Sequence, residues 1–366
     1  MKIALVHEFL TQLGGAERVL EVLHDLFPNA PVHTIVHDKK KTDNNFVKWN
    51  VKTSFLQKLP FGITHYKWFL ALMPSAIESF KFEGFDVVFS DASAFAKGIK
   101  VPKKIPHICY CHTPTRYLWQ MEDEYVASQP YPAWALALAR LVLAWQRRWD
   151  YKAASRVTRF IANSSEVQNR IKKHYNRDSI VIYPPIRTDF FIPKVNPSRD
   201  YFLAAGRLEP YKRFDIIIEA CRKLSLPLKI AGTGSLETSL KKQYGGSVEF
   251  LGRVTDEELR SLYQNARAFV FPAYEDAGMM MVESLACGTP VIAFGKGGAL
   301  EFIERGKHGV LFEEQTVESL IGAISEFKTM EFDQKILREQ AEKFSVEVFK
   351  GQIRNVINEY APRMHE

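Results

Sequence analysis

The chain has 366 residues, which is long for a single hydrophobic core, so we expect two domains. Apolar residues make up 46% and charged residues 25%, as in an ordinary globular protein, and the net charge is +7. This charge suits a polyphosphate ligand, an anionic membrane surface or a nucleic acid. The basic residues are spread along the chain without a nucleic-acid-binding signature, so we expect no nucleic-acid partner.

Cysteine usage and hydropathy bear on the cellular compartment. Cys109 and Cys111 lack a second pair of ligands at a spacing that suits a metal, and free thiols are typical of a reducing compartment. The segment from Met1 to Glu8 is too short in apolar length for a signal peptide and predicts a first strand. No run reaches the ~18 apolar residues that span a bilayer. We therefore expect a cytoplasmic protein without a bound metal.

A strand, a glycine turn and a helix open the chain. The predicted strand at residues 3–6 is followed by Gly14 and Gly15 and then by a helix that ends near residue 27. Backbone N–H groups in such a turn can face a phosphate. The full dinucleotide-binding glycine pattern is absent, so a plain turn is the alternative interpretation.

His112 follows a predicted strand. Apolar runs predict strands at residues 32–36, 86–90 and 107–111, and the last of these ends directly before His112. Ligands of open α/β sheets bind beyond the carboxyl ends of the strands. His112 is therefore a candidate for contact with a substrate hydroxyl or a developing charge. A loop histidine with a local hydrogen bond is the alternative.

Two segments combine aromatic and basic side chains. Residues 55–73 predict an amphipathic surface helix, and residues 134–154 predict a long helix with a basic C-terminal half. Both are candidates for contact with an anionic membrane surface. The alternative for the first segment is packing of its aromatic residues in the core, and for the second an ordinary amphipathic helix.

The proline-rich segment at residues 184–198 predicts a linker between two domains. Strands alternate with helices on both sides of it, which predicts two parallel sheets wrapped by helices. We expect one domain at residues 1–190, a second at residues 200–345, and a C-terminal helix at residues 346–366 that packs back on the first domain.

Charged residues and glycines follow the predicted strands of the second half. Arg207 and Lys212 lie in the loop after the strand at residues 201–205, and Gly232 lies in a turn that exposes backbone groups. Arginine offers bidentate contacts and lysine a point charge, a pair that would neutralise a diphosphate. A solvated basic loop is the alternative.

Two carboxylates flank the start of a predicted short helix. Glu275 follows a buried strand, Gly278 lies near the helix start, and Glu283 lies on the helix. A helix N-terminus attracts phosphate, and carboxylates on each side can bind hydroxyls, which together suit a sugar nucleotide. A capped helix with two solvated acids is the alternative.

These motifs occur in order and at suitable spacing over nearly the whole chain. In the second half they are Gly206-Arg207-Leu208 with Lys212, Ala231-Gly232-Thr233-Gly234, Phe250-Leu251-Gly252-Arg253-Val254, Phe271-Pro272-Ala273, the pair Glu275 and Glu283, and Ala286-Cys287-Gly288-Thr289-Pro290. In the first half they are Gly14-Gly15-Ala16-Glu17, Cys111-His112-Thr113-Pro114-Thr115-Arg116 and Ala162-Asn163-Ser164. The second-half motifs resemble the donor domain of the retaining GT-B glycosyltransferases of family 4. The last two first-half motifs resemble the branch of that family that contains O-antigen and capsule mannosyltransferases.

The resemblance implies an α/β fold of two Rossmann-like parallel-sheet domains that face each other across a cleft. It also implies which residues bind the donor. The diphosphate would contact Gly14, Gly15, Arg207 and Lys212, the base would contact the backbone of Arg253 and Val254, and the ribose would contact Glu283. The sugar would contact His112 near the reacting carbon, Glu275 through its hydroxyls, and the backbone of Gly278, Met279 and Met280, with Gly232 also in the donor site.

The same resemblance implies the chemistry. His112, Glu275, Arg207 and Lys212 would act in catalysis, without a metal or another cofactor. The best expectation is transfer of mannose from GDP-mannose to a lipid-linked or polysaccharide glycan, with the protein peripheral on the inner face of the cytoplasmic membrane. Ala277 replaces the aromatic residue that is usual in the family, which bears on the identity of the sugar.

Two other classes of function remain as alternatives. One is a different enzyme on the same fold, either a sugar-nucleotide epimerase or a phosphorylase. The other is a non-catalytic subunit that binds sugar nucleotides. An epimerase needs no acceptor, so analysis of the products formed from donor alone separates it from a transferase.

Overall fold

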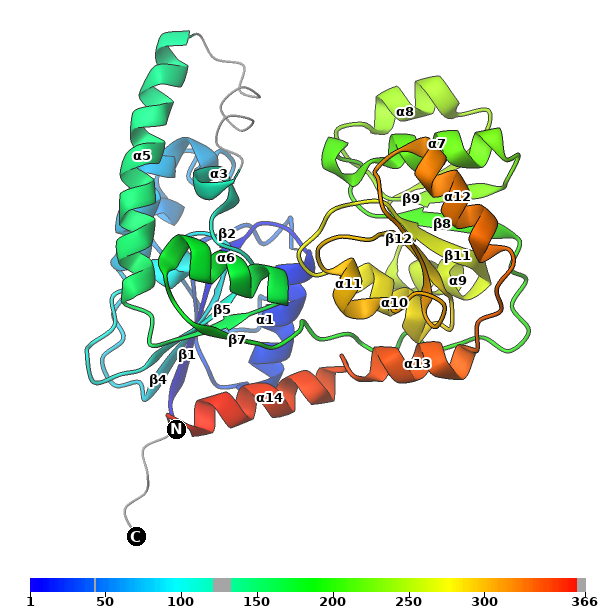
Figure 1. Cartoon of the computed structure of the whole chain (residues 1–366). Coiled ribbons are helices and arrows are strands. Elements are labelled where there is room, and N and C mark those ends of the chain that lie inside the picture. Colours follow the sequence, from blue (N-terminus) through cyan, green and yellow to red (C-terminus); the bar gives the residue numbers. More distant parts are fainter. Residues whose placement is uncertain (43, 121–132, 361–366) are drawn as a thin grey trace. The chain divides into compact units, whose positions relative to one another are not determined.

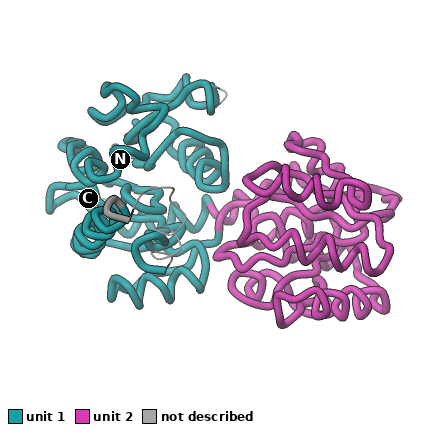
Figure 2. Tube along the Cα trace, turned by 90° about the horizontal axis from the view of Figure 1, so that it is seen from above, with its two compact units in different colours: residues 1–183, 350–366 teal, residues 184–349 magenta. Residues whose placement is uncertain are grey.

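The computed structural model describes residues 1–42, 44–120 and 133–360 (Figure 1). The chain divides into two compact units (Figure 2). Unit 1 comprises Met1–Tyr183 and Lys350–Glu366, and unit 2 comprises Pro184–Phe349. Each unit is a parallel β-sheet with its own helices and its own core.

Unit 2 begins earlier than the predicted domain boundaries. Residues 184–190, expected in the first domain, belong to unit 2. Ile186 forms a parallel bridge with Ser345, and Arg187 forms an ion pair with Asp256. Both partners belong to unit 2, so these contacts bind the segment to that unit. Of the expected C-terminal helix at 346–366, the last six positions lie outside the described residues.

The sheet of unit 1 has seven parallel strands among the described residues, in the order β3-β2-β1-β4-β5-β6-β7. These strands are β1 (Ile3–Leu10), β2 (Val32–His37), β3 (Val51–Thr53), β4 (Val87–Ala92), β5 (His107–Cys111), β6 (Arg159–Ala162) and β7 (Ser179–Val181). The strand order reverses between β1 and β4. The loops after these two strands therefore start from neighbouring positions, where doubly wound sheets bind ligands.

Helices cover the sheet of unit 1 and are fixed by ordinary end signals. They are α1 (Gly15–Leu26), α2 (Met73–Glu78), α3 (Arg116–Trp119), α5 (Ala133–Ser155), α6 (Ser165–Tyr175) and α14 (Val346–Asn358), with 3-10 turns η1 (Phe55–Lys58), η2 (Tyr66–Leu72) and η3 (Ala96–Gly98). Helix α6, for example, starts where Ser164 accepts a hydrogen bond from the backbone N–H of Val167, and ends at Asn176 in the left-handed conformation. Helix α14 begins in unit 2, and its residues from Lys350 onward belong to unit 1.

The sheet of unit 2 repeats this plan with six parallel strands in the order β10-β9-β8-β11-β12-β13. They are β8 (Tyr201–Ala205), β9 (Leu228–Ala231), β10 (Glu249–Gly252), β11 (Ala266–Phe271), β12 (Val291–Phe294) and β13 (Gly309–Phe312). The helices are α7 (Phe214–Lys223), α8 (Glu237–Tyr244), α9 (Asp256–Asn265), α10 (Met279–Ala286), α11 (Ala299–Phe302), α12 (Val317–Phe327) and α13 (Gln334–Glu342), with a 3-10 turn η4 (Pro210–Lys212). Here the order reverses between β8 and β11.

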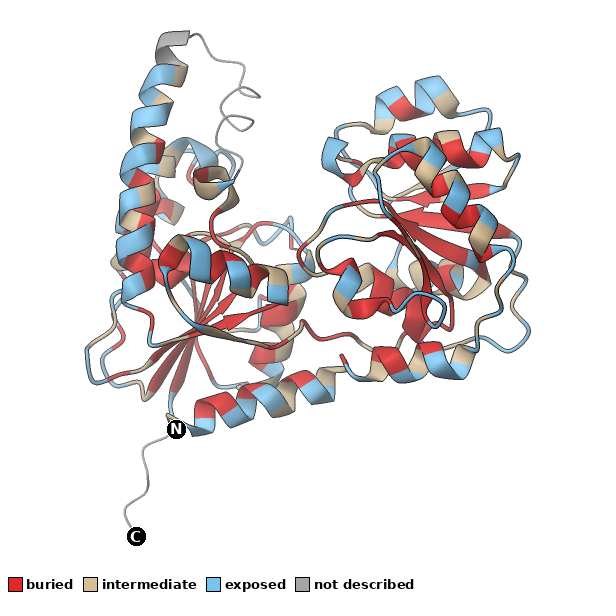
Figure 3. Ribbon diagram, viewed as in Figure 1, coloured by how far each residue is buried: buried red, intermediate tan, exposed pale blue. Residues whose placement is uncertain are grey.

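Burial of both sheet faces explains the sequence pattern of the strands. In both units the central strands lie between helices and are coloured as buried along most of their length, whereas the short strands β3, β7 and β10 are partly exposed (Figure 3). A parallel sheet that is covered on both faces needs continuous apolar runs rather than alternation, as in the fully buried β4 and β8. In β4 the run ends in Ser90 and Asp91, which are buried although polar, at the carboxyl end of the strand.

The aromatic segment at residues 55–73 is not the single amphipathic α-helix that we expected. It consists of η1 and η2, separated by a turn at Pro60 and Gly62. A Cβ on Gly62 would lie 1.9 Å from the carbonyl oxygen of Leu56, so the chain folds back tightly there. Of the aromatic side chains, Phe55, Phe61 and Trp68 are exposed, whereas Tyr66 and Phe69 pack on the core.

Helix α5 confirms the long helix that we predicted at residues 134–154. Strand β3, by contrast, was not predicted, because it is only three residues long and half-buried. Among the described residues, no helix combines the length and apolar character that a membrane crossing requires.

Candidate functional site

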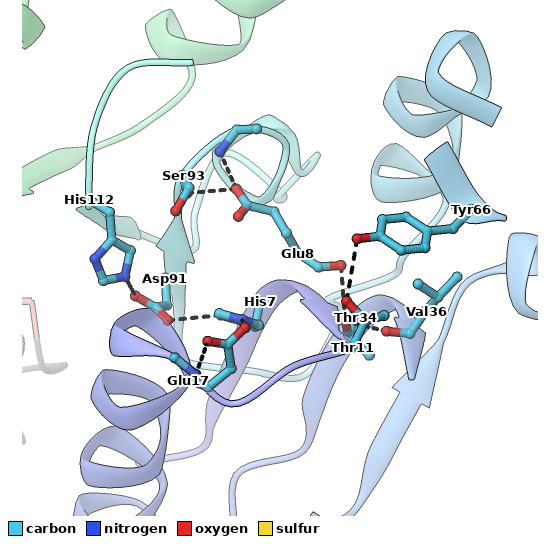
Figure 4. Close-up of polar contacts among 12 residues, drawn as sticks. His7, Glu8, Thr11, Glu17, Thr34, Val36, Tyr66, Asp91, Ser93 and His112 are labelled. Carbon is cyan, nitrogen blue, oxygen red and sulfur yellow. Dashed lines mark hydrogen bonds and ion pairs between the residues drawn. The ribbon is translucent and has the colours of Figure 1, made fainter. Parts of the chain in front are cut away.

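The carboxyl ends of β1 and β4 in unit 1 bring four ionisable side chains together. They are Glu17 of α1, His7 of β1, Asp91 of β4, and His112 directly after β5, and we call them the acid–histidine network (Figure 4). Asp91 occupies its centre, because its Oδ2 lies 2.8 Å from Nδ1 of His7 and its Oδ1 lies 2.5 Å from Nε2 of His112. Nε2 of His7 lies 3.8 Å from Oε1 of Glu17.

Charge balance within the network sets its pKa values. Burial by itself lowers the pKa of His7 and of His112, but the neighbouring carboxylates outweigh it and raise both above 6.5. Burial raises the pKa of Asp91, and the two histidines outweigh that effect and lower it. Each histidine of the network therefore faces at least one carboxylate, which is the pairing that buried charged groups require.

Glu8 fixes the loop that follows β4. Its carboxylate accepts hydrogen bonds from the backbone N–H groups of Ser93 at 2.7 Å, of Ala94, and of Ala96 at 3.2 Å. The side chain is 5% exposed. Several amide donors satisfy the hydrogen-bonding capacity of this buried carboxylate. Glu8 therefore fixes the backbone beside the network.

The predicted glycine turn lies next to the network. Gly14 is the N-cap of α1, and its backbone N–H donates to Oε2 of Glu17 at 2.9 Å. Gly15 begins the helix and is exposed. The turn therefore presents a helix N-terminus at the carboxyl end of β1, which is the geometry in which backbone N–H groups bind anions.

A second buried charge cluster supports the loops after β4 and β5. Lys97 of η3 lies 2.6 Å from Asp150 of α5, and both side chains are 1% exposed. Asp150 also accepts hydrogen bonds from Thr115 at 3.0 Å, Trp119 at 2.8 Å and Tyr175 at 2.7 Å. One carboxylate thus joins α5 to the segment that carries His112.

In unit 2, the turns after β8, β9 and β10 touch each other through their backbones. The N–H of Gly206 donates to Ala231, that of Leu208 to Thr233, and that of Gly232 to Gly252. Gly232 has a φ of +133°, and a Cβ there would lie 1.9 Å from the carbonyl oxygen of Gly206. This close approach accounts for Gly232 by backbone packing, whatever else the residue contacts.

Lys212 and Glu275 are brought together by these turns. Lys212, at the end of η4, forms an ion pair with Glu275, which follows β11. Their side chains are 10% and 21% exposed. Arg207, in the loop after β8, is exposed to solvent. Three predicted donor-binding residues therefore lie in loops at the carboxyl edge of this sheet, two of them in direct contact.

Helix α10 carries the rest of the predicted donor contacts in unit 2. Gly278 is its N-cap and is buried against Met281, while Met279 and Met280 begin the helix and are partly exposed. Glu283 is 4% exposed and accepts a hydrogen bond from the hydroxyl of Tyr263 at 3.2 Å. The helix thus places one carboxylate inside the fold, held by a buried tyrosine.

The remaining predicted contacts lie after β10. Arg253 is exposed and Val254 is partly exposed, directly before the capping box in which Thr255 and Glu258 exchange hydrogen bonds. They share the carboxyl edge with the other loops but follow β10, which is a strand at the edge of the sheet.

Our sequence reasoning named His112 but missed the residues that hold it. Asp91 could have been suspected, because a polar residue directly follows a buried apolar run. His7 likewise directly follows the apolar run at residues 3–6, and Glu17 stands in the Gly14-Gly15-Ala16-Glu17 motif, but neither was assigned a role. In unit 2 we also missed how Glu275 is fixed: its carbonyl oxygen accepts a hydrogen bond from Gly298 at 2.8 Å, in the glycine run after β12.

Cys109 and Cys111, for which we expected no metal, lie on β5. Both are buried free thiols, and burial raises the pKa of Cys109 to about 12, so a thiolate is disfavoured. Within the described residues there is no group of three or more histidine, cysteine or acidic side chains arranged for a metal.

Family models match both halves of the chain. The model of glycosyltransferase family 4 matches residues 13–190, and the model of glycosyl transferases group 1 matches residues 185–344. An uncharacterized glycosyltransferase of Methanocaldococcus jannaschii is 26% identical over 359 residues, 94% of this chain and 93% of that protein. D-inositol 3-phosphate glycosyltransferase of Streptomyces bingchenggensis is 28% identical over 42% of this chain and 41% of its own length.

Solved structures share the fold. The Anabaena protein HepE, in complex with UDP and glucose, has a TM-score of 0.70 at 20% identity, covering 98% of this chain and 99% of that one. Sucrose-phosphate synthase of Thermosynechococcus elongatus has a TM-score of 0.76 at 16% identity, with 98% and 99% covered. The chain therefore has the GT-B architecture of two Rossmann-like parallel-sheet domains, and it belongs to the group 1 and family 4 glycosyltransferases.

Proposed function

We propose that this glycosyltransferase transfers a sugar from a nucleotide-diphosphate donor to a hydroxyl of a glycan acceptor, with retention of the anomeric configuration. The observation that carries the proposal is the pair of Lys212 and Glu275 beside the N-terminus of α10. A cation, a carboxylate and a helix N-terminus at the switch point of a parallel sheet match the phosphates and hydroxyls of a sugar nucleotide.

In the proposed reaction the bond between the anomeric carbon and the diphosphate breaks and the acceptor oxygen takes its place. The acceptor proton leaves with the diphosphate. Negative charge develops on the leaving group, where Lys212, Arg207 and the amides at the start of α10 would stabilise it. Glu275 would exchange its ion pair with Lys212 for hydrogen bonds to sugar hydroxyls, and Glu283 would bind the ribose. We propose that no metal takes part.

The donor is the first point to test. Mannose from GDP-mannose follows from the sequence resemblance, and glucose from UDP-glucose is the second candidate, because HepE was solved with UDP-glucose. The test is a panel of UDP-, GDP- and ADP-sugars, read by nucleotide release with and without acceptor in the presence of EDTA. The proposal would be contradicted if none of the donors released its nucleotide. It would also be contradicted if the enzyme converted a donor into its epimer without an acceptor.

The acceptor and the location form a further part of the proposal. We propose a lipid-linked or polysaccharide acceptor at the cytoplasmic face of the membrane. Leu138, Leu141 and Trp145 are exposed on one side of α5, with the exposed Arg148 near them. Apolar side chains flanked by cations suit an anionic bilayer surface. The wild-type protein should sediment with anionic liposomes at low salt, and this binding should be lost in Leu141→Glu and at high salt. If the wild-type protein binds the liposomes at no salt concentration, this location is rejected.

A further inference from the structure

The acid–histidine network alternates carboxylates and imidazoles across four different elements. Glu17 belongs to α1, His7 to β1, Asp91 to β4 and His112 to the segment after β5. Figure 4 shows His7 and His112 on opposite sides of Asp91, with Glu17 next to His7. Three of the four are almost fully buried, and only the side chain of His112 reaches the surface, with 14% of it exposed.

Asp91 determines which ring nitrogen of His112 is available. Its Oδ1 holds Nε2 of His112, and its Oδ2 is already used by His7. Among the residues that the structure describes, Nδ1 of His112 has no hydrogen-bond partner. The ring stands edge to face against Tyr110, with centroids 5.3 Å apart, which restricts its rotation. His112 is thus fixed with one nitrogen on the protein and the other available to a ligand.

Glu17 joins the network to the glycine turn. Its Oε2 accepts the hydrogen bond of the Gly14 N–H at 2.9 Å, and its Oε1 faces His7. A single carboxylate therefore holds the start of α1 and balances the charge of the inner histidine. Without the charge of Glu17, Asp91 would be the only carboxylate that faces His7. Asp91 would then interact more strongly with His7 and less with His112.

We propose that Asp91 and His7 are positioning residues that hold His112 as an imidazolium with its Nδ1–H toward the donor sugar or its leaving group, and that Glu17 couples this arrangement to the glycine turn. This inference rests on the proposed function for the identity of the ligand. It assigns His112 the part of a cationic hydrogen-bond donor. A protonated imidazole has no lone pair to accept a proton, so His112 is not a general base.

Charge balance favours this protonation state. The ionisable groups that act on His112 are Asp91 of β4 and His7 and Glu8 of β1, and His7 in turn faces Glu17 of α1. With His112 neutral, the network would carry a net negative charge inside the fold, next to Glu8. Burial lowers the pKa of His112, but Asp91 outweighs it and the pKa ends above 6.5.

The test is a titration of His112 by ¹⁵N NMR of the histidine side chains in the full chain without donor. In the wild type we expect the ring to stay protonated at pH 7 and to lose its proton only at higher pH. In Asp91→Asn the ring should titrate at or below pH 6.5, and the turnover number should fall on the order of 10²-fold with a change in donor KM below about threefold.

Glu17→Gln gives a second reading if Asp91→Asn does not fold. We expect a smaller downward shift of the His112 titration and a higher KM for the donor, because the glycine turn loses its carboxylate. Glu78→Gln is the matched control: Glu78 accepts hydrogen bonds from Trp149 and Arg156 in the same unit but lies outside the network. It should leave the His112 titration unchanged.

Two outcomes would overturn the inference. One is a neutral His112 at pH 7 in the wild type, and the other is an unchanged His112 titration in Asp91→Asn. Absence of transfer with every donor would instead reject the proposed function, and the NMR titration would still report on the network. The two failures are therefore distinguishable.

Discussion

The two units differ in how the loops at the carboxyl edge of the sheet are held. In unit 1 buried charged side chains hold these loops, whereas in unit 2 glycine turns contact each other through their backbones. In unit 1 the loops are held by carboxylates with several partners each, Glu8, Asp91 and Asp150. In unit 2 they are held by main-chain hydrogen bonds between turns such as Gly206 and Gly232, and the ion pair of Lys212 and Glu275 lies on top of them.

The same fold therefore prepares two kinds of site. Buried charges are costly unless paired, so unit 1 needs every member of its clusters and gains a fixed arrangement of side chains in return. Contact between backbones leaves no room for side chains, so the turns of unit 2 depend on residues without a Cβ, such as Gly232. Substitutions in each unit can test this contrast.

Asp150→Ala should be the most damaging change to unit 1. It leaves the ammonium group of Lys97 buried without its counter-charge and removes the acceptor of three other side chains. We expect a loss of about 3–5 kcal/mol in the free energy of unfolding, measured by urea titration. Glu78→Ala, at a more exposed ion pair with Arg156, should cost about 1 kcal/mol or less. Equal losses would show that burial of the charge does not matter.

Lys212→Ala should abolish most of the transfer activity without unfolding unit 2. The lysine is the cation nearest Glu275, and the leaving group would lose a charged donor. We expect the rate of transfer to fall on the order of 10²- to 10³-fold. Lys229→Ala removes a comparable charge on β9, paired with Glu249, and should leave the rate unchanged. A fully active Lys212→Ala enzyme would remove the lysine from the mechanism.

Gly232→Ala should destabilise unit 2 through the backbone alone. The new Cβ would meet the carbonyl oxygen of Gly206, at a positive φ that disfavours alanine. We expect a loss of at least about 1–3 kcal/mol in the free energy of unfolding. Gly322→Ala, in the exposed part of α12 where a Cβ has no neighbour within 4 Å, should instead stabilise by about 0.5–1 kcal/mol. The same sign in both variants would contradict the role given to backbone contact.

Acid should weaken unit 1 through a histidine that is buried without a counter-charge. Burial, assisted by Arg156, lowers the pKa of His107 to about 3, so the unfolded state binds the proton more tightly. The stabilising contribution is present above pH 6.5 and is lost as pH falls toward 3, by about 1.4 kcal/mol per pH unit. Urea titrations at pH 7 and pH 5 should show a smaller loss in His107→Gln than in the wild type. An equal loss would assign acid sensitivity to other groups.

Much of the fold was predictable from sequence because buried parallel strands leave continuous apolar runs. The alternation of such runs with helices predicted both sheets, and the spacing of Glu275, Gly278 and Glu283 predicted a carboxylate pair around a helix start. Short or irregular elements left weaker signals. Strand β3 has only three residues, and the turn at Pro60 and Gly62 divided a segment whose composition favoured one helix.

By itself, the sequence determined which residues follow each strand, and therefore that His112, Arg207, Lys212 and Glu275 lie at the carboxyl edges of the sheets. The contacts of those residues depend on how distant strands pair in the folded chain. His7 and Asp91 are 84 positions apart and meet because β1 and β4 are neighbours in the sheet. Pairing of distant strands sets which buried charges balance each other, and no local pattern encodes that choice.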